Sequence, residues 1–206
     1  MFRGAPDTAV GTAWQRKLSR VCDVTFASVA LLLLGLPMLL VGLIIRMTSR
    51  GPVLYRQMRI GLNGRPFVIL KFRTMRVDAE ERTGPIWARP GDPRCTFFGK
   101  MLRRLSIDEL PQLINVIRGE MSLVGPRPER PFFVRNFSRE LPHYPERHRV
   151  LPGITGWAQV NGWRGDTPID KRLAADLDYI RNWSLTFNLR ILAITPFRVL
   201  FGKNAC

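Results

Sequence analysis

The chain has 206 residues and a formal net charge of +16. This length allows one compact domain plus a membrane element, and the charge favours anionic over cationic partners: nucleic acid, anionic lipid or phosphorylated small molecules. Most of the basic residues are arginines, whose planar fork can bind two phosphate oxygens at once. The three cysteines show neither metal-ligand nor disulfide spacing, which is typical of a reducing compartment: Cys22, Cys95 and Cys206.

The first part of the chain predicts a tail followed by a membrane element. Residues 1–13 are small and polar and predict a flexible tail. Residues 14–22 mix basic and apolar side chains, a composition that suits a membrane surface. Residues 24–45 contain no ionisable side chain. As a straight helix they would extend about 33 Å, enough to cross a hydrocarbon core of about 30 Å.

Two features favour a re-entrant helix over a spanning one. Leu36-Pro37 lies in the middle of the apolar run, and proline predicts a kink there. Arginines and a lysine flank the run on both sides, and cationic flanks prefer the cytoplasmic side. A helix that enters, breaks near Pro37 and returns satisfies both flanks. The spanning alternative stays open, because proline is tolerated in spanning helices.

A β-hairpin is predicted after the membrane segment. Residues 53–60 form one strand, Asn63-Gly64 the tight turn and residues 67–74 the return strand. Alternation places Lys71 and Arg73 on one face of this strand, as candidate phosphate ligands or as a solvated face. Residues 78–95 are polar and broken by prolines, as in a lid, a substrate loop or a plain surface loop.

Three further helices are predicted. The first has apolar residues at helical spacing and ends before a glycine: Leu110, Leu113, Ile114, Ile117 and Gly119. The second starts with Thr167 as N-cap, Pro168 in the first turn and Asp170 in the capping-box position. Residues 185–201 are apolar but interrupted by two arginines and a proline, which suits a surface-lying helix or a core helix.

The candidate catalytic residues are two adjacent carboxylates, Asp108 and Glu109. They lie at a helix start under either of two boundaries, one capped by Ser106 and the other beginning at Pro111. The positive end of a helix favours ionised carboxylates. An ionised carboxylate can attack phosphorus or hold Mg²⁺, and adjacent acids allow one to do each. An isolated Asp-Glu pair at a helix start is otherwise an ordinary structural feature.

Several arginines supply phosphate-binding groups beside this pair. Arg103 and Arg104 directly precede it and favour the ionised carboxylates. Pro126-Arg127-Pro128 holds one guanidinium on a backbone that is restricted on both sides. Such a group loses little conformational entropy when it binds a phosphate.

Taken together, these motifs resemble the bacterial sugar transferases. These are monotopic polyprenyl-phosphate hexose-1-phosphate transferases that start exopolysaccharide, capsule and O-antigen synthesis. The matching segments are Gly51-Pro52-Val53, Tyr55-Arg56-Gln57, Lys71-Phe72-Arg73-Thr74-Met75 and residues 104–113, 119–129 and 152–162. The resemblance covers the chain beyond about residue 15 and is closest to the short form that consists of the catalytic domain.

The resemblance implies an α/β membrane-associated fold. Residues 14–47 would form the interfacial segment and re-entrant helix, with Asp23, Leu36 and Pro37 in its membrane motif. Residues 48–206 would form a catalytic domain, with the small hairpin and several amphipathic helices around a cytosolic active site. Two departures from the family pattern are Cys22 before Asp23, where Phe is common, and Leu36 before Pro37, where Ser is common.

The resemblance also implies a reaction. Asp108 would attack the β-phosphorus of a UDP-sugar, UMP would leave, and undecaprenyl phosphate would take the phospho-sugar. Glu109 would hold Mg²⁺. The substrate-binding residues would be Lys71, Arg73, Arg103, Arg104 and Arg127. Residues 156–162 resemble the corresponding segment of relatives that use UDP-glucose or UDP-galactose.

The implied location is the bacterial inner membrane, with the lipid bilayer as a partner and the active site facing the cytoplasm. No nucleic-acid motif is present in the sequence, so nucleic acid is not expected as a partner. The alternatives are a basic nucleic-acid-binding protein and a catalytically silent basic membrane adapter. A homo-oligomer is compatible with the sequence.

Overall fold

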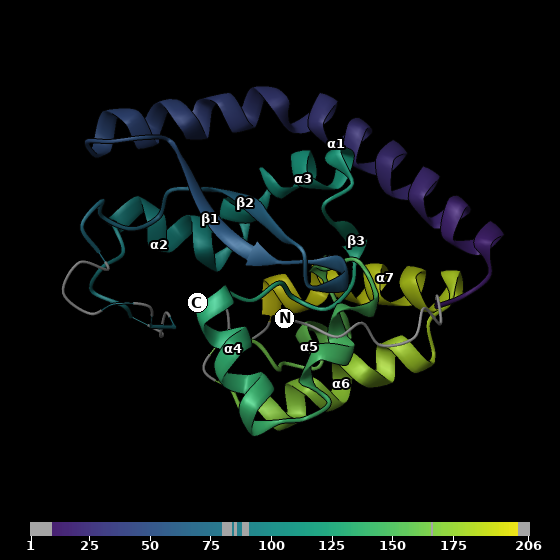
Figure 1. The fold of residues 1–206 in the computed structure, drawn as a ribbon. Helices are drawn as coiled ribbons and strands as arrows, with labels where there is room; N and C mark the ends of the chain where they lie inside the picture. Colours follow the sequence, from purple (N-terminus) through teal and green to yellow (C-terminus); the bar gives the residue numbers. More distant parts are fainter. Residues whose placement is uncertain (1–9, 80–83, 85, 88–90, 166, 202–206) are drawn as a thin grey trace.

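The computed structural model describes residues 10–79, 84, 86–87, 91–165 and 167–201. Most of the predicted tail, Cys206 and part of the predicted 78–95 loop therefore lie outside the described residues. The elements in chain order are α1 (Ala13–Thr48), β1 (Leu54–Ile60), η1 (Leu62–Gly64), β2 (Pro66–Phe72), α2 (Phe97–Arg104), η2 (Ile107–Glu109), α3 (Gln112–Arg118), β3 (Ser122–Val124), α4 (Pro131–Glu140), η3 (Tyr144–Arg149), β4 (Gly153–Thr155), α5 (Trp157–Val160), α6 (Ile169–Arg181) and α7 (Leu185–Phe201). In Figure 1, α1 runs along one side of the molecule and α4 and α6 lie on the opposite side, with the β1–β2 hairpin between them.

Helix α1 is continuous over 36 residues and includes the predicted surface segment 14–22 as well as the apolar run. It starts with a capping box in which Gln15 N donates to Thr12 Oγ1 and Thr12 N donates to Gln15 Oε1. The predicted break at Pro37 is absent, because α1 stays helical through this residue. The two halves of the helix do lie at an angle in Figure 1, as a kink would produce. A bend is the expected effect of a proline inside a helix. By length and composition α1 could cross a membrane.

Both ends of α1 are attached to the rest of the chain. Arg20 donates to the carbonyl groups of Val116 and Ile117, in the last turn of α3, at 2.6 and 3.0 Å. Asp23 accepts from Ser122 Oγ at 2.7 Å and from the backbone of β3 at 3.2 Å. At the other end, Arg73 donates to the carbonyl groups of residues 49 and 50 at 2.9 and 2.8 Å. The two ends of the helix therefore contact one and the same body of the protein.

Strands β1 and β2 form the predicted antiparallel hairpin, with Tyr55 opposite Lys71. Asn63 and Gly64 adopt the positive φ angles that the turn requires, 53° and 75°. The return strand ends at Phe72, two residues earlier than predicted.

Asn115 occupies the outer edge of β2, where a third strand would otherwise pair. Its Nδ2 donates to Val68 O at 2.7 Å and its Oδ1 accepts from Leu70 N at 3.0 Å. The side chain is fully buried, and Nδ2 also donates to Glu120 Oε2 at 2.6 Å. Because Asn115 belongs to α3, this contact fixes β2 against the helix that follows the carboxylate pair.

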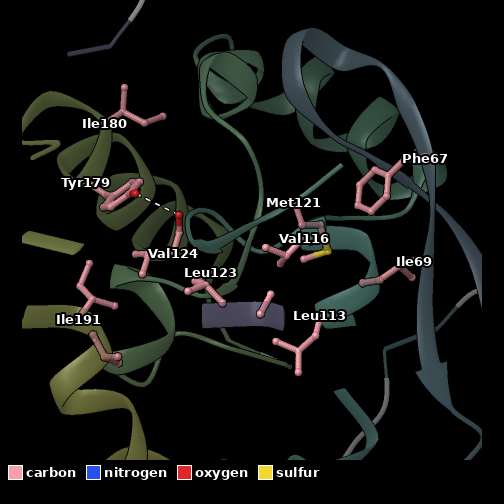
Figure 2. Close-up of a cluster of buried hydrophobic side chains, with 12 residues drawn as sticks. Phe67, Ile69, Leu113, Val116, Met121, Leu123, Val124, Tyr179, Ile180 and Ile191 are labelled. Atoms are coloured by element: carbon pink, nitrogen blue, oxygen red, sulfur yellow. Dashed lines mark hydrogen bonds between the residues drawn. The ribbon is translucent and has the colours of Figure 1, made fainter. Parts of the chain in front are cut away.

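The main apolar core joins α1, α3, β2, β3 and the C-terminal helices (Figure 2). Strands β3 and β4, which the sequence did not predict, form a short parallel pair within it. Tyr179 donates to Val124 O at 3.1 Å and links α6 to β3. In α7, Ile191 is fully buried whereas Phe197 and Leu200 are exposed. Helix α7 thus has the predicted bounds, with one buried face and one exposed apolar face.

Of the two helix starts predicted at the carboxylate pair, the one capped by Ser106 is wrong and the one at Pro111 is correct to within one residue; the cap predicted at Thr167 is also wrong. Ser106 has a φ of 55° and makes no capping hydrogen bond, whereas Pro111 is the N-cap of α3. The carboxylate pair lies in the 3-10 turn η2. Glu109, which would have completed the capping box with Ser106, forms ion pairs with Lys71 and Arg127 instead. Helix α6 has Pro168 at its N-cap, and Thr167 Oγ1 accepts from Arg172 rather than capping the helix.

Candidate active site

A cavity of about 840 Å³ lies beside the hairpin and is also lined by residues of α2, η2 and α6. This volume lies within the range of small-molecule sites. Its lining is strongly basic: Arg56, Arg59, Lys71, Arg73, Arg76, Arg94, Arg103, Arg127, Arg130, Arg164 and Arg172. Among the described lining residues, Asp108 and Glu129 carry the negative charges. The cavity therefore suits an anionic ligand.

Asp108 faces this cavity, whereas its neighbour Glu109 is held by two cations. Glu109 Oε1 accepts from Lys71 Nζ at 2.8 Å and from Arg127 Nη2 at 2.5 Å. Glu109 Oε2 accepts from Arg127 Nη1 at 3.2 Å. Both carboxylates are buried. The fold thus brings together four of the predicted site residues from β2, η2 and the segment before α4.

The two carboxylates have opposite electrostatic environments. Burial raises the pKa of Asp108, and the nearby Lys71 offsets part of that rise. Burial also opposes ionisation of Glu109, but Arg127 and Lys71 outweigh it and hold the pKa of that carboxyl well below its usual range. Neighbouring acids whose pKa values are pushed apart are suited to different roles.

Of the other predicted substrate-binding residues, Arg73 and Arg103 line the cavity and Arg104 does not. Arg73 lines the cavity, but its guanidinium donates to the backbone at the end of α1. Arg103 lines the cavity and donates to Cys95 Sγ at 3.4 Å. Arg104 is exposed and lies outside the cavity lining. The membrane-motif residues Asp23 and Pro37 belong to α1 and also lie outside it.

The Pro-Arg-Pro segment is held in place through its carbonyl groups. The four carbonyls of residues 126–129 accept, in chain order, from Gly153 N (3.0 Å), Arg147 Nη2 (2.8 Å), Arg59 Nη1 (3.0 Å) and Ile60 N (3.0 Å). Proline cannot donate from its own nitrogen, so a segment with two prolines depends on its acceptors for anchorage. This arrangement fixes the backbone that carries Arg127.

Sequence reasoning missed the buried ion pairs behind this segment. Arg147 Nε and Nη2 donate to Asp176 Oδ2 at 2.9 and 2.6 Å, and Nη1 donates to Tyr144 OH at 2.9 Å. Arg172 Nη1 donates to Glu129 Oε1 at 2.8 Å. The partners are far apart in the chain and follow neither a motif nor a period, so no sequence signal pairs them.

The carboxylate pair can accommodate Mg²⁺ if a substrate supplies further oxygens. Within the described part of the chain, no group of three or more His, Cys, Asp and Glu side chains could hold a metal ion by itself. Mg²⁺ usually takes only one or two carboxylates together with substrate phosphates. A carboxylate offers about four lone-pair sites. Lys71 and Arg127 use three of those on Glu109, and Asp108 lies beside it at the cavity.

Comparison with known proteins identifies close relatives. The model of the bacterial sugar transferase family matches residues 14–202. A UDP-glucose:undecaprenyl-phosphate glucose-1-phosphate transferase of Xanthomonas campestris pv. campestris is 49% identical over 187 residues, which are 89% of this chain and 39% of that protein. A Caulobacter vibrioides protein of the same name is 46% identical over 190 residues, 90% of this chain and 71% of that protein.

A third relative acts on a different sugar. The UDP-N-acetylgalactosamine-undecaprenyl-phosphate N-acetylgalactosaminephosphotransferase of Aeromonas hydrophila is 44% identical over 191 residues, 91% of this chain and 45% of that protein. The chain thus spans less than half the length of the Xanthomonas and Aeromonas relatives. Each of the three matches covers 89–91% of this chain.

Proposed function

The chain belongs to the bacterial sugar transferase family, and we propose that it is a phosphoglycosyl transferase that moves a hexose 1-phosphate from a UDP-sugar to undecaprenyl phosphate. The observation that carries this proposal is the division between the two carboxylates. Asp108 faces a basic cavity, whereas Glu109 is fixed by Lys71 and Arg127. The family relatives named above act on the same two kinds of substrate.

In the proposed mechanism Asp108 is the nucleophile. A carboxylate oxygen of Asp108 bonds to the β-phosphorus of the donor, and the bond between that phosphorus and the bridging oxygen breaks. UMP leaves with the electron pair of the broken bond. A phosphate oxygen of undecaprenyl phosphate then attacks the same phosphorus, and the Asp108 carboxylate is released. Glu109 is unsuited to the attack, because both of its oxygens already accept from cations.

The basic residues of the cavity hold the donor in this proposal. Lys71 and Arg127 lie at the cavity wall beside Asp108, where they can face the diphosphate. Charge-assisted hydrogen bonds from such groups are among the strongest polar contacts in proteins. They lower the repulsion between an anionic nucleophile and an anionic substrate. Arg73 and Arg103 also line the cavity and extend the positive surface.

We assign Mg²⁺ to Glu109, together with diphosphate oxygens of the donor. A bound Mg²⁺ would neutralise charge on the diphosphate. Lys71 and Arg127 keep Glu109 ionised, and their three hydrogen bonds leave about one of its four lone-pair sites for the metal.

The attachment of α1 favours the re-entrant arrangement over a spanning one. Arg20 and residue 50 are separated by about 45 Å along a straight helix, more than the hydrocarbon thickness of about 30 Å. Yet both positions contact the same catalytic body. A spanning helix would place them on opposite sides of the bilayer. We therefore propose that α1 enters and leaves the inner membrane on the cytoplasmic side, where its basic flanks also belong.

The identity of the donor sugar is the most specific part of the proposal. UDP-glucose and UDP-galactose are the donors we expect, and UDP-N-acetylgalactosamine is the alternative raised by the Aeromonas relative. The reaction, which forms an undecaprenyl-diphospho-sugar, would be the first membrane step of exopolysaccharide, capsule or O-antigen synthesis.

A donor panel tests the proposed function. Membranes that contain the protein are supplied with undecaprenyl phosphate and each UDP-sugar in turn, and UMP release is measured. We expect release with one class of donor and none from membranes that contain Asp108→Asn. If no donor is turned over by protein that is folded and membrane-bound, the silent membrane adapter becomes the better description.

A further inference from the structure

We propose that Arg147 is a positioning residue for the transfer reaction, which acts by orienting Arg127 against the carboxylate pair. This inference rests on the proposed function and adds a residue that none of the sequence motifs includes. Arg147 is only 2% exposed and lies outside the lining of the cavity. It therefore cannot touch the donor or the acceptor, and any effect on the reaction must pass through a neighbour.

The neighbour is Arg127, whose carbonyl oxygen accepts from Arg147 Nη2 at 2.8 Å. The rings of Pro126 and Pro128 fix their own φ angles, and Pro128 confines Arg127 to the extended region, within which the ψ of Arg127 can still vary over about 40°. A hydrogen bond to the Arg127 carbonyl fixes the plane of the following peptide and with it the ψ angle of Arg127. The side chain of Arg127 then forms its two bonds to Glu109 from a defined backbone.

Arg147 is itself held from the opposite side. Asp176 in α6 accepts from two of its nitrogens, and Tyr144 accepts from a third. Asp176 is 2% exposed, so the ion pair is buried on both sides. The fork of an arginine can serve a carboxylate and a carbonyl group at the same time, whereas the single ammonium of a lysine cannot reproduce that geometry. The contacts form one line from Asp176 through Arg147 to Arg127 and on to Glu109.

A purely stabilising role does not explain this line of contacts well. Replacing a buried ion pair by apolar residues of similar volume is often neutral or stabilising, because the charges lose their hydration. The immediate surroundings also offer an apolar solution, since Ile60, Val134, Tyr144 and Leu173 form a buried cluster. What an apolar pair could not supply is the donor to the Arg127 carbonyl.

A double-mutant cycle tests the inference with the full chain in membranes. Arg147→Lys, Arg127→Ala and the double variant are compared by UMP release and by thermal unfolding. We expect Arg147→Lys to lower kcat by about 10- to 100-fold with little change in KM, as for other small displacements of a positioned group. In the Arg127→Ala background, Arg147→Lys should cause no further loss, because its only route to the reaction is already removed.

A matched control separates positioning from general stability. Val134 is 1% exposed, lies in the neighbouring apolar cluster and has no polar side-chain atoms. Val134→Ala should lower the unfolding temperature at least as much as Arg147→Lys does, yet leave kcat within about twofold. Asp176→Asn, which weakens the support of Arg147, should reproduce the kcat loss of Arg147→Lys.

The results that overturn the inference differ from those that overturn the proposed function. If the losses from Arg147→Lys and Arg127→Ala multiply, or if Val134→Ala lowers kcat as much as Arg147→Lys does, then Arg147 acts by general stability. If the wild-type protein releases no UMP from any donor, the proposed function fails instead. In that case crosslinking of a photoreactive UDP probe to wild type, but less to Arg147→Lys, would still support the positioning of Arg127, and equal crosslinking would contradict it.

Discussion

Lys71 Nζ lies 2.8 Å from Glu109 Oε1, and that same oxygen accepts from Arg127 at 2.5 Å. Two cations on one carboxylate keep Glu109 ionised despite its burial. Asp108, one residue earlier, faces the cavity without sharing these bonds and has a raised pKa. Adjacent positions in one 3-10 turn thus hold one carboxylate bound by two cations and one carboxyl group that faces the cavity.

We expect Asp108→Asn to abolish transfer, with a loss on the order of 10⁴-fold or more, because the amide is a poor nucleophile. Intact-mass spectrometry after incubation with donor alone should show a phospho-sugar adduct on the wild type and none on the variant. Asp78→Asn, an exposed change of the same kind, is the matched control and should keep full activity. Substantial turnover by Asp108→Asn would disprove the nucleophile assignment.

The acid limb of the pH profile should report on Asp108. The nucleophile must be ionised, so kcat/KM falls as the pH drops through its pKa, which burial raises above 3.8. Lys71 lowers that pKa, so Lys71→Met should shift the limb to higher pH. Lys71→Arg, which keeps the charge, should leave the limb near its wild-type position. A limb that does not move in Lys71→Met would contradict the coupling.

Removal of divalent cations should stop the reaction. We expect an excess of chelator to abolish UMP release and added Mg²⁺ to restore it, because the metal shields charge on the diphosphate. Glu109→Gln should require more Mg²⁺ for half-maximal activity than the wild type. Full activity in chelator would remove the metal role assigned to Glu109.

Asn115→Leu should destabilise the fold by about 2–4 kcal/mol, because it leaves two buried backbone groups of β2 without partners. Denaturant unfolding in detergent measures this change. Asn115→Asp keeps an acceptor for Leu70 N but loses the donor to Val68 O, and its charge would face Glu120. A stability of Asn115→Leu equal to that of the wild type would show that the edge of β2 needs no cap.

The re-entrant arrangement predicts that both flanks of α1 face the cytoplasm. We expect single cysteines at Lys17→Cys and Arg50→Cys, introduced after the three native cysteines are replaced by Ser, to be protected from an impermeant maleimide in intact spheroplasts. Both should react once the membrane is opened. Labelling of one position in intact spheroplasts would instead show that α1 spans the bilayer.

The sequence was informative where local chemistry decides the structure. Asn63-Gly64 predicts the hairpin because few other pairs accept its φ angles, and Gly119 marks the end of α3 because it adopts a φ of 83° there. The bounds of α7 followed from its apolar composition.

The sequence was less informative where contacts between distant residues decide. The capping box at Ser106 was a sound local expectation, but Glu109 is drawn to Lys71 and Arg127, which lie far away in the chain. The same holds for Arg147 and Asp176, which only the packing of η3 against α6 brings together. Strands as short as β3 and β4 carry too few residues to show a period.

The attachment of α1 at both its ends has a consequence for how the reaction is supplied. In the re-entrant arrangement that we propose, a catalytic body held by α1 at two points would keep its cavity at a constant height above the lipid, and an acceptor would reach Asp108 by lateral diffusion alone. The rate of the second half-reaction should then follow the mole fraction of undecaprenyl phosphate in the membrane. Diluting the vesicles in buffer should leave that rate unchanged, whereas diluting the acceptor with inert phospholipid should lower it.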